Sequence, residues 1–221
     1  MPEEPIRRIV VLTHTMFNDL RIGMVDPLKK QPPLPKKLKS LIEGAIKDPH
    51  THVIITRSDG AFPHDELEGL LKKIPRNRRY VSEFDDIDKD CLYAVQREGQ
   101  NFFVDDPEQM RRLKSNAFAP EVEIESWGDA HSQCHSINVS EIAEMLIDHG
   151  INIKKIHFVG GMPTVSESLL NNAARGETIP KEKHAAYEKE REVLLRNMKE
   201  YFGDLMDRVE IDWPPTDPKN A

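Results

Sequence analysis

Residues 128–136 (GDAHSQCHS) hold the densest group of reactive side chains in the sequence. The segment brings together a carboxylate, two imidazoles and a thiol, from Asp129, His131, His135 and Cys134. An imidazole beside a thiol stabilises the thiolate, which is the form that attacks a carbonyl carbon. One interpretation is therefore that Cys134 is a catalytic nucleophile and that His131 or His135 assists it.

The same segment supports a second interpretation, in which it binds zinc. His131 and His135 are four residues apart, a spacing that puts two ligands on one face of a helix. The third ligand would be Asp129, Cys134 or a distant histidine, and a metal-dependent hydrolase would use Asp129. A third interpretation assigns no chemistry, and both histidines are then solvated on a polar surface loop. Apart from zinc, we expect no cofactor.

The N-terminal part of the chain has the pattern of a βαβ unit. Apolar, β-branched runs at 6–12 (IRRIVVL) and 52–56 (HVIIT) are typical of strands buried on both faces. Between them, at 38–47, apolar side chains recur at helical spacing. A right-handed crossover through that helix would place the two strands side by side and parallel.

The C-terminal part continues this alternation. Strands are predicted at 122–126, 155–159 and 209–213, and a long helix at 181–206. Asn138 and Glu141 have the spacing of a capping box, so a helix should begin at Asn138 and end before Gly150. The reactive segment 128–136 then follows a strand and precedes a helix, at the edge where open α/β sheets bind ligands.

Further candidate binding residues also stand at strand ends. Asp59 follows the strand at 52–56, and Trp127 follows the strand at 122–126. Gly160 and Gly161 close the strand at 155–159, where we expect a tight turn. A glycine pair can let a phosphate approach backbone N–H groups, but this pair has neither the Rossmann glycine spacing nor a Walker lysine.

Composition places the chain among globular proteins of a reducing compartment. Its 221 residues, with a net charge of −7 and charges of mixed sign, suit a single domain spanning 1–221. The acidic balance argues against nucleic acid as a partner, and no apolar run reaches the roughly 20 residues that span a membrane. Cys91 and Cys134 make no disulfide framework, and the N-terminus has no ordinary secretory signal. We expect a cytoplasmic location, or export by a specialised secretion system.

Two stretches interrupt the α/β pattern. A proline-rich connector covers 29–37, and a charged insertion lies near 74–100. Within the connector, the segment that runs from Pro32 to Lys37 has the P-x-x-P core that docks on SH3-like domains. The alternative interpretation is a stiff linker between a strand and a helix.

The order of these motifs resembles the caspase-like cysteine peptidase fold. The most similar group is the self-cleaving protease domain of multifunctional RTX toxins and large clostridial toxins. Residues 41–60 (LIEGAIKDPHTHVIITRSDG) are similar to the family's early helix, short loop and strand that ends near Ser-Asp-Gly. Residues 122–162 are similar in layout to its strand ending in Gly-His-Gly, polar loop, capped helix and strand ending in Gly-Cys.

The resemblance implies a three-layer α/β domain with a mostly parallel sheet flanked by helices, and a generic doubly wound fold is the alternative. Trp127 stands at the family's histidine position and Gly161 at its cysteine position, so the inherited catalytic pair is missing. The resemblance therefore implies a degenerate peptidase domain that binds a protein or peptide partner, as an effector or toxin-associated module. A cysteine-dependent hydrolase or peptidase rebuilt in 128–136, or a metal-dependent hydrolase using the same segment, are the alternatives.

Overall fold

The computed structural model describes residues 4–13, 33–58, 64–84, 103, 106–129, 131, 134–164 and 168–217. Within this part of the chain, six parallel strands form one sheet in the order β3-β2-β1-β4-β5-β6. The strands are β1 (Ile6–Thr13), β2 (Thr51–Ser58), β3 (Arg79–Phe84), β4 (Phe118–Asp129), β5 (Asn152–Met162) and β6 (Val209–Ile211). The expected α/β domain with a parallel sheet is confirmed, and its strand order is that of a doubly wound sheet.

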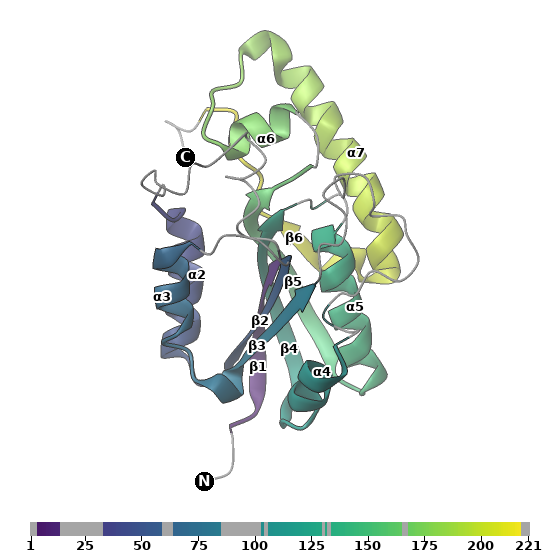
Figure 1. Ribbon diagram of the computed structural model, residues 1–221. Coiled ribbons are helices and arrows are strands. Elements are labelled where there is room, and N and C mark those ends of the chain that lie inside the picture. The colour runs from purple at the N-terminus through teal and green to yellow at the C-terminus, as the bar shows by residue number, and fades with distance from the viewer. Residues whose placement is uncertain are drawn as a thin grey trace.

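Helices cover both sides of the sheet, as Figure 1 shows. On one side, here called the α2 face, lie α2 (Lys36–Lys47) and α3 (Asp65–Leu71). On the other, the α5 face, lie α4 (Pro107–Lys114), α5 (Cys134–Asp148) and α7 (His184–Phe202). From β1 the chain first adds β2 and β3 on one side of the sheet, and then returns to add β4, β5 and β6 on the other side. Because crossovers are right-handed, this change of direction puts the later helices on the opposite face. The short α6 (Leu169–Ala174) lies at the carboxyl end of the strands.

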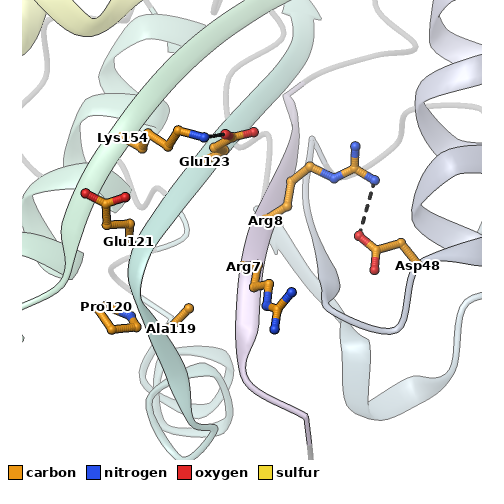
Figure 2. Close-up of a pocket in the computed structure, with 8 residues that line it drawn as sticks. All are labelled: Arg7, Arg8, Asp48, Ala119, Pro120, Glu121, Glu123 and Lys154. Atoms are coloured by element: carbon orange, nitrogen blue, oxygen red, sulfur yellow. Dashed lines mark hydrogen bonds and ion pairs between the residues drawn. The ribbon is translucent and has the colours of Figure 1, made fainter.

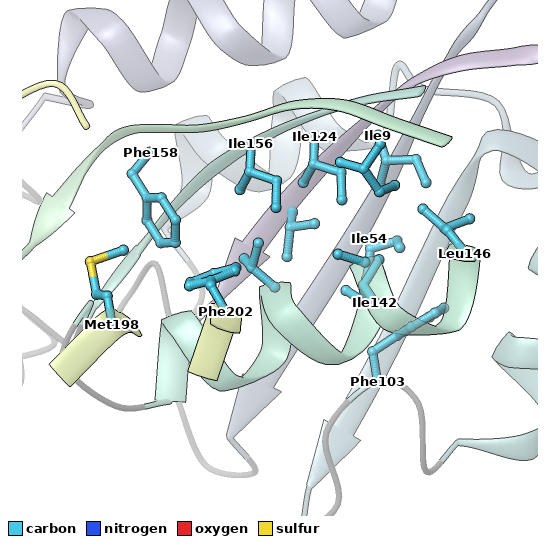
Figure 3. Close-up of a cluster of buried hydrophobic side chains, with 14 of the residues drawn as sticks. Ile9, Ile54, Phe103, Ile124, Ile142, Leu146, Ile156, Phe158, Met198 and Phe202 are labelled. Atoms are coloured by element: carbon cyan, nitrogen blue, oxygen red, sulfur yellow. The ribbon is translucent and has the colours of Figure 1, made fainter. Parts of the chain in front are cut away.

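The central position of β1 in the sheet explains why residues 9–12 are all apolar. Its side chains alternate between two clusters: Ile9 and Val11 pack on the α5 face, and Val10 and Leu12 on the α2 face. Figure 3 shows the larger cluster, where the sheet meets α5 and the C-terminal part of α7. The labelled side chains there are Ile9, Ile54, Phe103, Ile124, Ile142, Leu146, Ile156, Phe158, Met198 and Phe202.

The start of α5 differs from the prediction. The helix begins at Cys134, one turn before Asn138, and Asn138 is a buried residue inside it. The Asn138 amide donates to the hydroxyls of Thr13 (2.9 Å) and Thr56 (3.0 Å), and its oxygen accepts from the backbone N–H of Phe103 at 3.4 Å. The asparagine therefore joins the helix to β1 and β2 and does not cap it. Gly150 follows the end of α5 as predicted, and its φ is positive, at 75°.

Gly160 and Gly161 also differ from the prediction, because they lie inside β5 and make no turn. The pairing of β4 with β5 skips one residue, so that Ser126 pairs with Phe158 and Trp127 with Gly160. A Cβ on Gly160 would lie 2.2 Å from the Trp127 ring. A Cβ on Gly161, whose φ is +121°, would lie 1.7 Å from the carbonyl oxygen of Gly128. Glycine is needed at both positions because β4 leaves no room for a side chain.

Other boundaries moved by a few residues. The helix expected at 181–206 consists of η4 (Lys181–Lys183), α7 and η5 (Gly203–Arg208), and the last strand stops at Ile211. The charged stretch near 74–100 begins with η1 (Arg76–Arg78) and the edge strand β3, and 85–100 lie outside the described residues.

Replacement of Gly161 tests the close approach of β4 and β5. We expect Gly161→Ala to lower the free energy of unfolding by roughly 3 kcal/mol or more, because the methyl group meets backbone and the positive φ disfavours alanine. Gly69→Ala in α3 is the control, since nothing lies within 4 Å of its Cβ and alanine should stabilise the helix by up to about 1 kcal/mol. Urea denaturation measures both, and equal stability of the two variants would contradict the described packing.

Candidate functional site

The candidate site lies at the carboxyl edge of the sheet, next to the point where the strand order reverses. β1 ends at Thr13 and pairs there with Gly128 near the end of β4. A Cβ on Gly128 would lie 2.4 Å from the carbonyl oxygen of Thr13, so the two strands are in close contact up to this edge. In doubly wound folds, ligands bind in the crevice at this place.

Cys134 occupies the first position of α5, directly after the connection from β4. Its side chain is partly exposed. The first backbone N–H groups of a helix have no acceptor within the helix, and together with the helix dipole they favour a negative charge at its N-terminus. Cys134 also lies near Tyr201 of α7. Burial raises the pKa of Tyr201, and the nearby charges of Glu200 and Cys134 raise it further.

The two histidines lie side by side, but in the core. His131 is 2% exposed and His135 is 0% exposed, so the interpretation as a solvated loop is wrong for both. Their ring centroids are 4.8 Å apart, and each ring packs against Phe158, at 5.2 Å for His131 and 4.8 Å for His135. The sequence placed them on one helical face, but His131 precedes α5 and reaches His135 from the strand side.

His131 is held as a neutral imidazole. Its Nε2 donates to the carbonyl oxygen of Gly160 at 3.3 Å, because a carbonyl can only accept. Burial lowers the pKa of His131 to about 4, so Nδ1 is a bare acceptor at neutral pH. Within the described part of the chain, Nδ1 is buried and has no hydrogen-bond partner. His131 is therefore not a cation that could pair with a thiolate at rest.

The zinc interpretation stays a prediction. Among the described residues, no group of three or more His, Cys, Asp and Glu side chains is arranged to bind a metal ion. Asp129 ends β4, but its side chain lies outside the described part, as do all atoms of Asp59.

Trp127, Gly160 and Gly161 come together at a different feature, a cavity of about 460 Å³ at the carboxyl end of β4, β5 and β6. His131 lines it as well. The cavity is also lined by the end of the proline-rich segment up to Lys37, which the sequence singled out only as a docking motif. The other lining residues come from α2, the N-cap of α3, the end of α6 and the segment after β6, and they include Leu38, His64, Arg175, Asp212 and Trp213. The signal available in the sequence was the second tryptophan of the chain, placed before a Pro-Pro pair.

Asp212 is the fixed anion of this cavity. It accepts from Lys37 Nζ at 2.7 Å and from His157 Nε2 at 2.9 Å. Burial alone would raise the pKa of Asp212, but these two hydrogen bonds outweigh burial and lower it. Lys37 belongs to α2 and the Leu34 side chain is buried in the core. The described part of the proline-rich segment, residues 33–37, is therefore packed onto the domain.

A second hollow lies at the opposite, amino end of the strands and holds no residue that the sequence predicted. It is lined by Arg7, Arg8, Asp48, Ala119, Pro120, Glu121, Glu123 and Lys154. Figure 2 shows two ion pairs among its charged residues, Arg8 with Asp48 at 3.6 Å and Lys154 with Glu123 at 2.6 Å. We assign no chemistry to it.

Comparison with family models, with curated proteins and with solved structures found no match to this chain. Among the described residues, no helix is both long and apolar enough to cross a membrane. The site must therefore be interpreted from its own geometry.

The burial of His131 predicts a loss of stability in acid. Its folded pKa of about 4 is below the ordinary 6.5, so the unfolded chain binds a proton that the folded chain excludes. The free energy of unfolding therefore keeps its full value, as far as His131 is concerned, above pH 6.5. It decreases as the pH drops from 6.5 toward 4, by about 3 kcal/mol in total.

Urea denaturation between pH 7 and pH 4 measures this effect. We expect His131→Gln to flatten part of the pH dependence. His52, whose pKa burial also lowers to about 4, accounts for a second part, so the double variant with His52→Gln should flatten it further. An unchanged profile in His131→Gln would contradict the neutral, buried state of this imidazole.

Proposed function

We propose that this chain is a hydrolase in which Cys134 attacks the carbonyl carbon of an amide or ester. The observation that carries the proposal is the position of Cys134: it begins α5 directly after β4, at the carboxyl edge beside the reversal of strand order. Nucleophilic thiols need a partly exposed site with positive electrostatic character, and the N-terminus of a helix supplies it. Cys134 is half-buried, and its position at the start of α5 provides the positive electrostatic character.

The reaction would proceed through a thioester. The thiolate forms a C–S bond with the carbonyl carbon, and first-turn N–H groups of α5 stabilise the negative oxygen. The C–N or C–O bond then breaks, and the leaving group takes a proton from water. A second water hydrolyses the thioester, releasing the acid and restoring the thiol. Because His131 is neutral, the helix N-terminus has to stabilise the resting thiolate. A reducing compartment keeps this thiol active.

The strand order is shared with dinucleotide-binding domains, but the sequence does not favour that function. Residues 14–22, which follow β1, contain no glycine. The dinucleotide fingerprint needs glycines there, so that the backbone can approach the pyrophosphate.

The partner-binding interpretation of a degenerate caspase-like domain is the second candidate. Its support is position 161, where contact with Gly128 leaves no room for the thiol that the resemblance would place there. An SH3-like domain is the less favoured partner, because Lys37 is helical and paired with Asp212.

Thiol chemistry distinguishes the two candidates. In a Cys91→Ala background, we expect alkylation of Cys134 to follow an apparent pKa below the ordinary value of about 8.5. Hydrolysis of an activated ester such as p-nitrophenyl acetate should follow the same ionisation. Cys134→Ala should lower its rate at least about a hundredfold at an unchanged melting temperature, since it removes the nucleophile.

The controls are Cys91→Ala alone, which should keep the activity, and alkylation in the presence of added zinc. A thiol of ordinary pKa, together with unchanged hydrolysis in Cys134→Ala, would contradict the hydrolase and favour the partner-binding candidate. If only added zinc protects the thiol from alkylation, a metal site would be supported instead.

A further inference from the structure

The cavity at the carboxyl end of β4, β5 and β6 has the dimensions of a small-molecule site. Its volume of about 460 Å³ falls in the range of pockets that enclose small ligands. Aliphatic side chains from separate parts of the chain line it, among them Leu38 of α2, Val159 of β5 and Ile211 of β6. Cys134 is not among the described residues that line the cavity, so this inference goes beyond the proposed hydrolase.

The carboxylate in the lining is already balanced by cationic and polar groups of the chain. One oxygen of Asp212 accepts from Lys37 Nζ at 2.7 Å, and the other accepts from His157 Nε2 at 2.9 Å. Both carboxylate oxygens are thus hydrogen-bonded, and the lysine that lines the cavity faces its own counter-charge.

The other described side chains of the lining that can carry a charge are engaged as well. His131 is a neutral imidazole that donates to the carbonyl oxygen of Gly160. His64 and Arg175 have interactions of their own within the chain. A charged ligand would therefore lose its hydration in this cavity without gaining an unpaired counter-charge, whereas an uncharged ligand would not pay that cost.

Proline rings make up much of the remaining wall. Five of the described lining residues are prolines, namely Pro33, Pro35, Pro163, Pro214 and Pro215. Proline has no backbone N–H, so none of these residues offers the cavity a donor. The wall is correspondingly poor in the backbone N–H groups that bind phosphates and carboxylates in other proteins.

Two tryptophans supply the aromatic part of the wall. Trp127 lies on Gly160, where a Cβ would come within 2.2 Å of the ring, so the absent side chain makes room for the indole. The guanidinium of Arg191 lies over the ring of Trp213, 4.5 Å from its centroid. Both indoles are thereby held in place by the protein, and a ring fixed in this way packs against an aromatic ligand at little cost in entropy.

We propose that this cavity binds a small uncharged ligand with a planar aromatic ring system. The rings of the ligand pack against Trp127, Trp213 and the aliphatic side chains of the wall. The ligand carries no ionised group, because the described lining has no unpaired charge to receive one.

A matched set of naphthalene derivatives tests charge and aromaticity separately. Near neutral pH, 2-naphthylmethanol is uncharged, 2-naphthoate is an anion and 2-naphthylmethylamine is a cation, all on the same ring system. Decahydronaphthylmethanol is uncharged but saturated. The reporters are Trp127 and Trp213, the two tryptophans of the chain, which both line the cavity. Labelling with 5-fluorotryptophan gives each a fluorine NMR resonance, assigned with Trp127→Phe and Trp213→Phe.

We expect 2-naphthylmethanol to shift both fluorine resonances and to reach saturation, so that the titration gives its Kd. The anion and the cation should each bind at least about tenfold more weakly, because neither finds an unpaired partner. The saturated alcohol should bind about threefold more weakly, because it lacks the aromatic contacts with the indoles.

Filling the cavity is the second test. Val159→Phe adds a ring at a half-buried position of the lining and should weaken the binding of 2-naphthylmethanol at least about tenfold. Val193→Phe is the matched control: it makes the same exchange on α7, at a position 42% exposed and outside the described lining, and should bind as the unmodified chain does. Melting temperatures show that both variants are folded.

Binding should persist in Cys134→Ala, whether or not that variant hydrolyses esters. The proposal is overturned if 2-naphthylmethanol shifts neither resonance up to its solubility limit, or if either ion binds as tightly as the alcohol. It is also overturned if folded Val159→Phe protein binds as tightly as Val193→Phe. Should Val159→Phe not fold, the four probes on the unmodified chain decide.

Discussion

The buried amide of Asn138 is the contact on which the carboxyl edge of this domain depends. It donates to Thr13 at the end of β1 and to Thr56 near the end of β2, and it belongs to the second turn of α5. Two strands and one helix are thereby held at one point, and both polar atoms of the buried Asn138 side chain are hydrogen-bonded. Because Cys134 lies one turn before Asn138 in the same helix, these hydrogen bonds also fix its position at the edge of the sheet.

The glycines of β4 and β5 set the other side of the edge. Gly128 lets β4 touch Thr13, and Gly161 lets β5 touch Gly128, so three neighbouring strands reach the edge without a side chain between them. Trp127 then has room to lie on Gly160 and to form a wall of the cavity. The same carbonyl that this arrangement exposes, that of Gly160, orients His131. Burial lowers the pKa of His131 and keeps it neutral, and the hydrogen bond to Gly160 fixes which ring nitrogen carries the proton.

Much of the fold could be predicted because it follows from local patterns. From residue 9 to residue 12 every side chain of β1 is apolar, as a strand between two helical layers requires. Helix α4 was predictable from Asp106 and Pro107, and the Asp106 side chain does accept from the N–H groups of Glu108 and Gln109. The start of α5 was not, since Asn138 has the composition of a cap but spends its hydrogen bonds on distant strands.

The sequence by itself determined the layered α/β class, the positions of most strands, and the segment in which the reactive side chains gather. Burial was decided only by the tertiary structure, because it depends on partners far along the chain. Phe158 of β5 draws His131 and His135 into the core, and segments before α2 and after β6 meet beside Trp127 to close a cavity. Spacing along a chain can bring residue types together, but the dielectric around each of them is set by what packs against it.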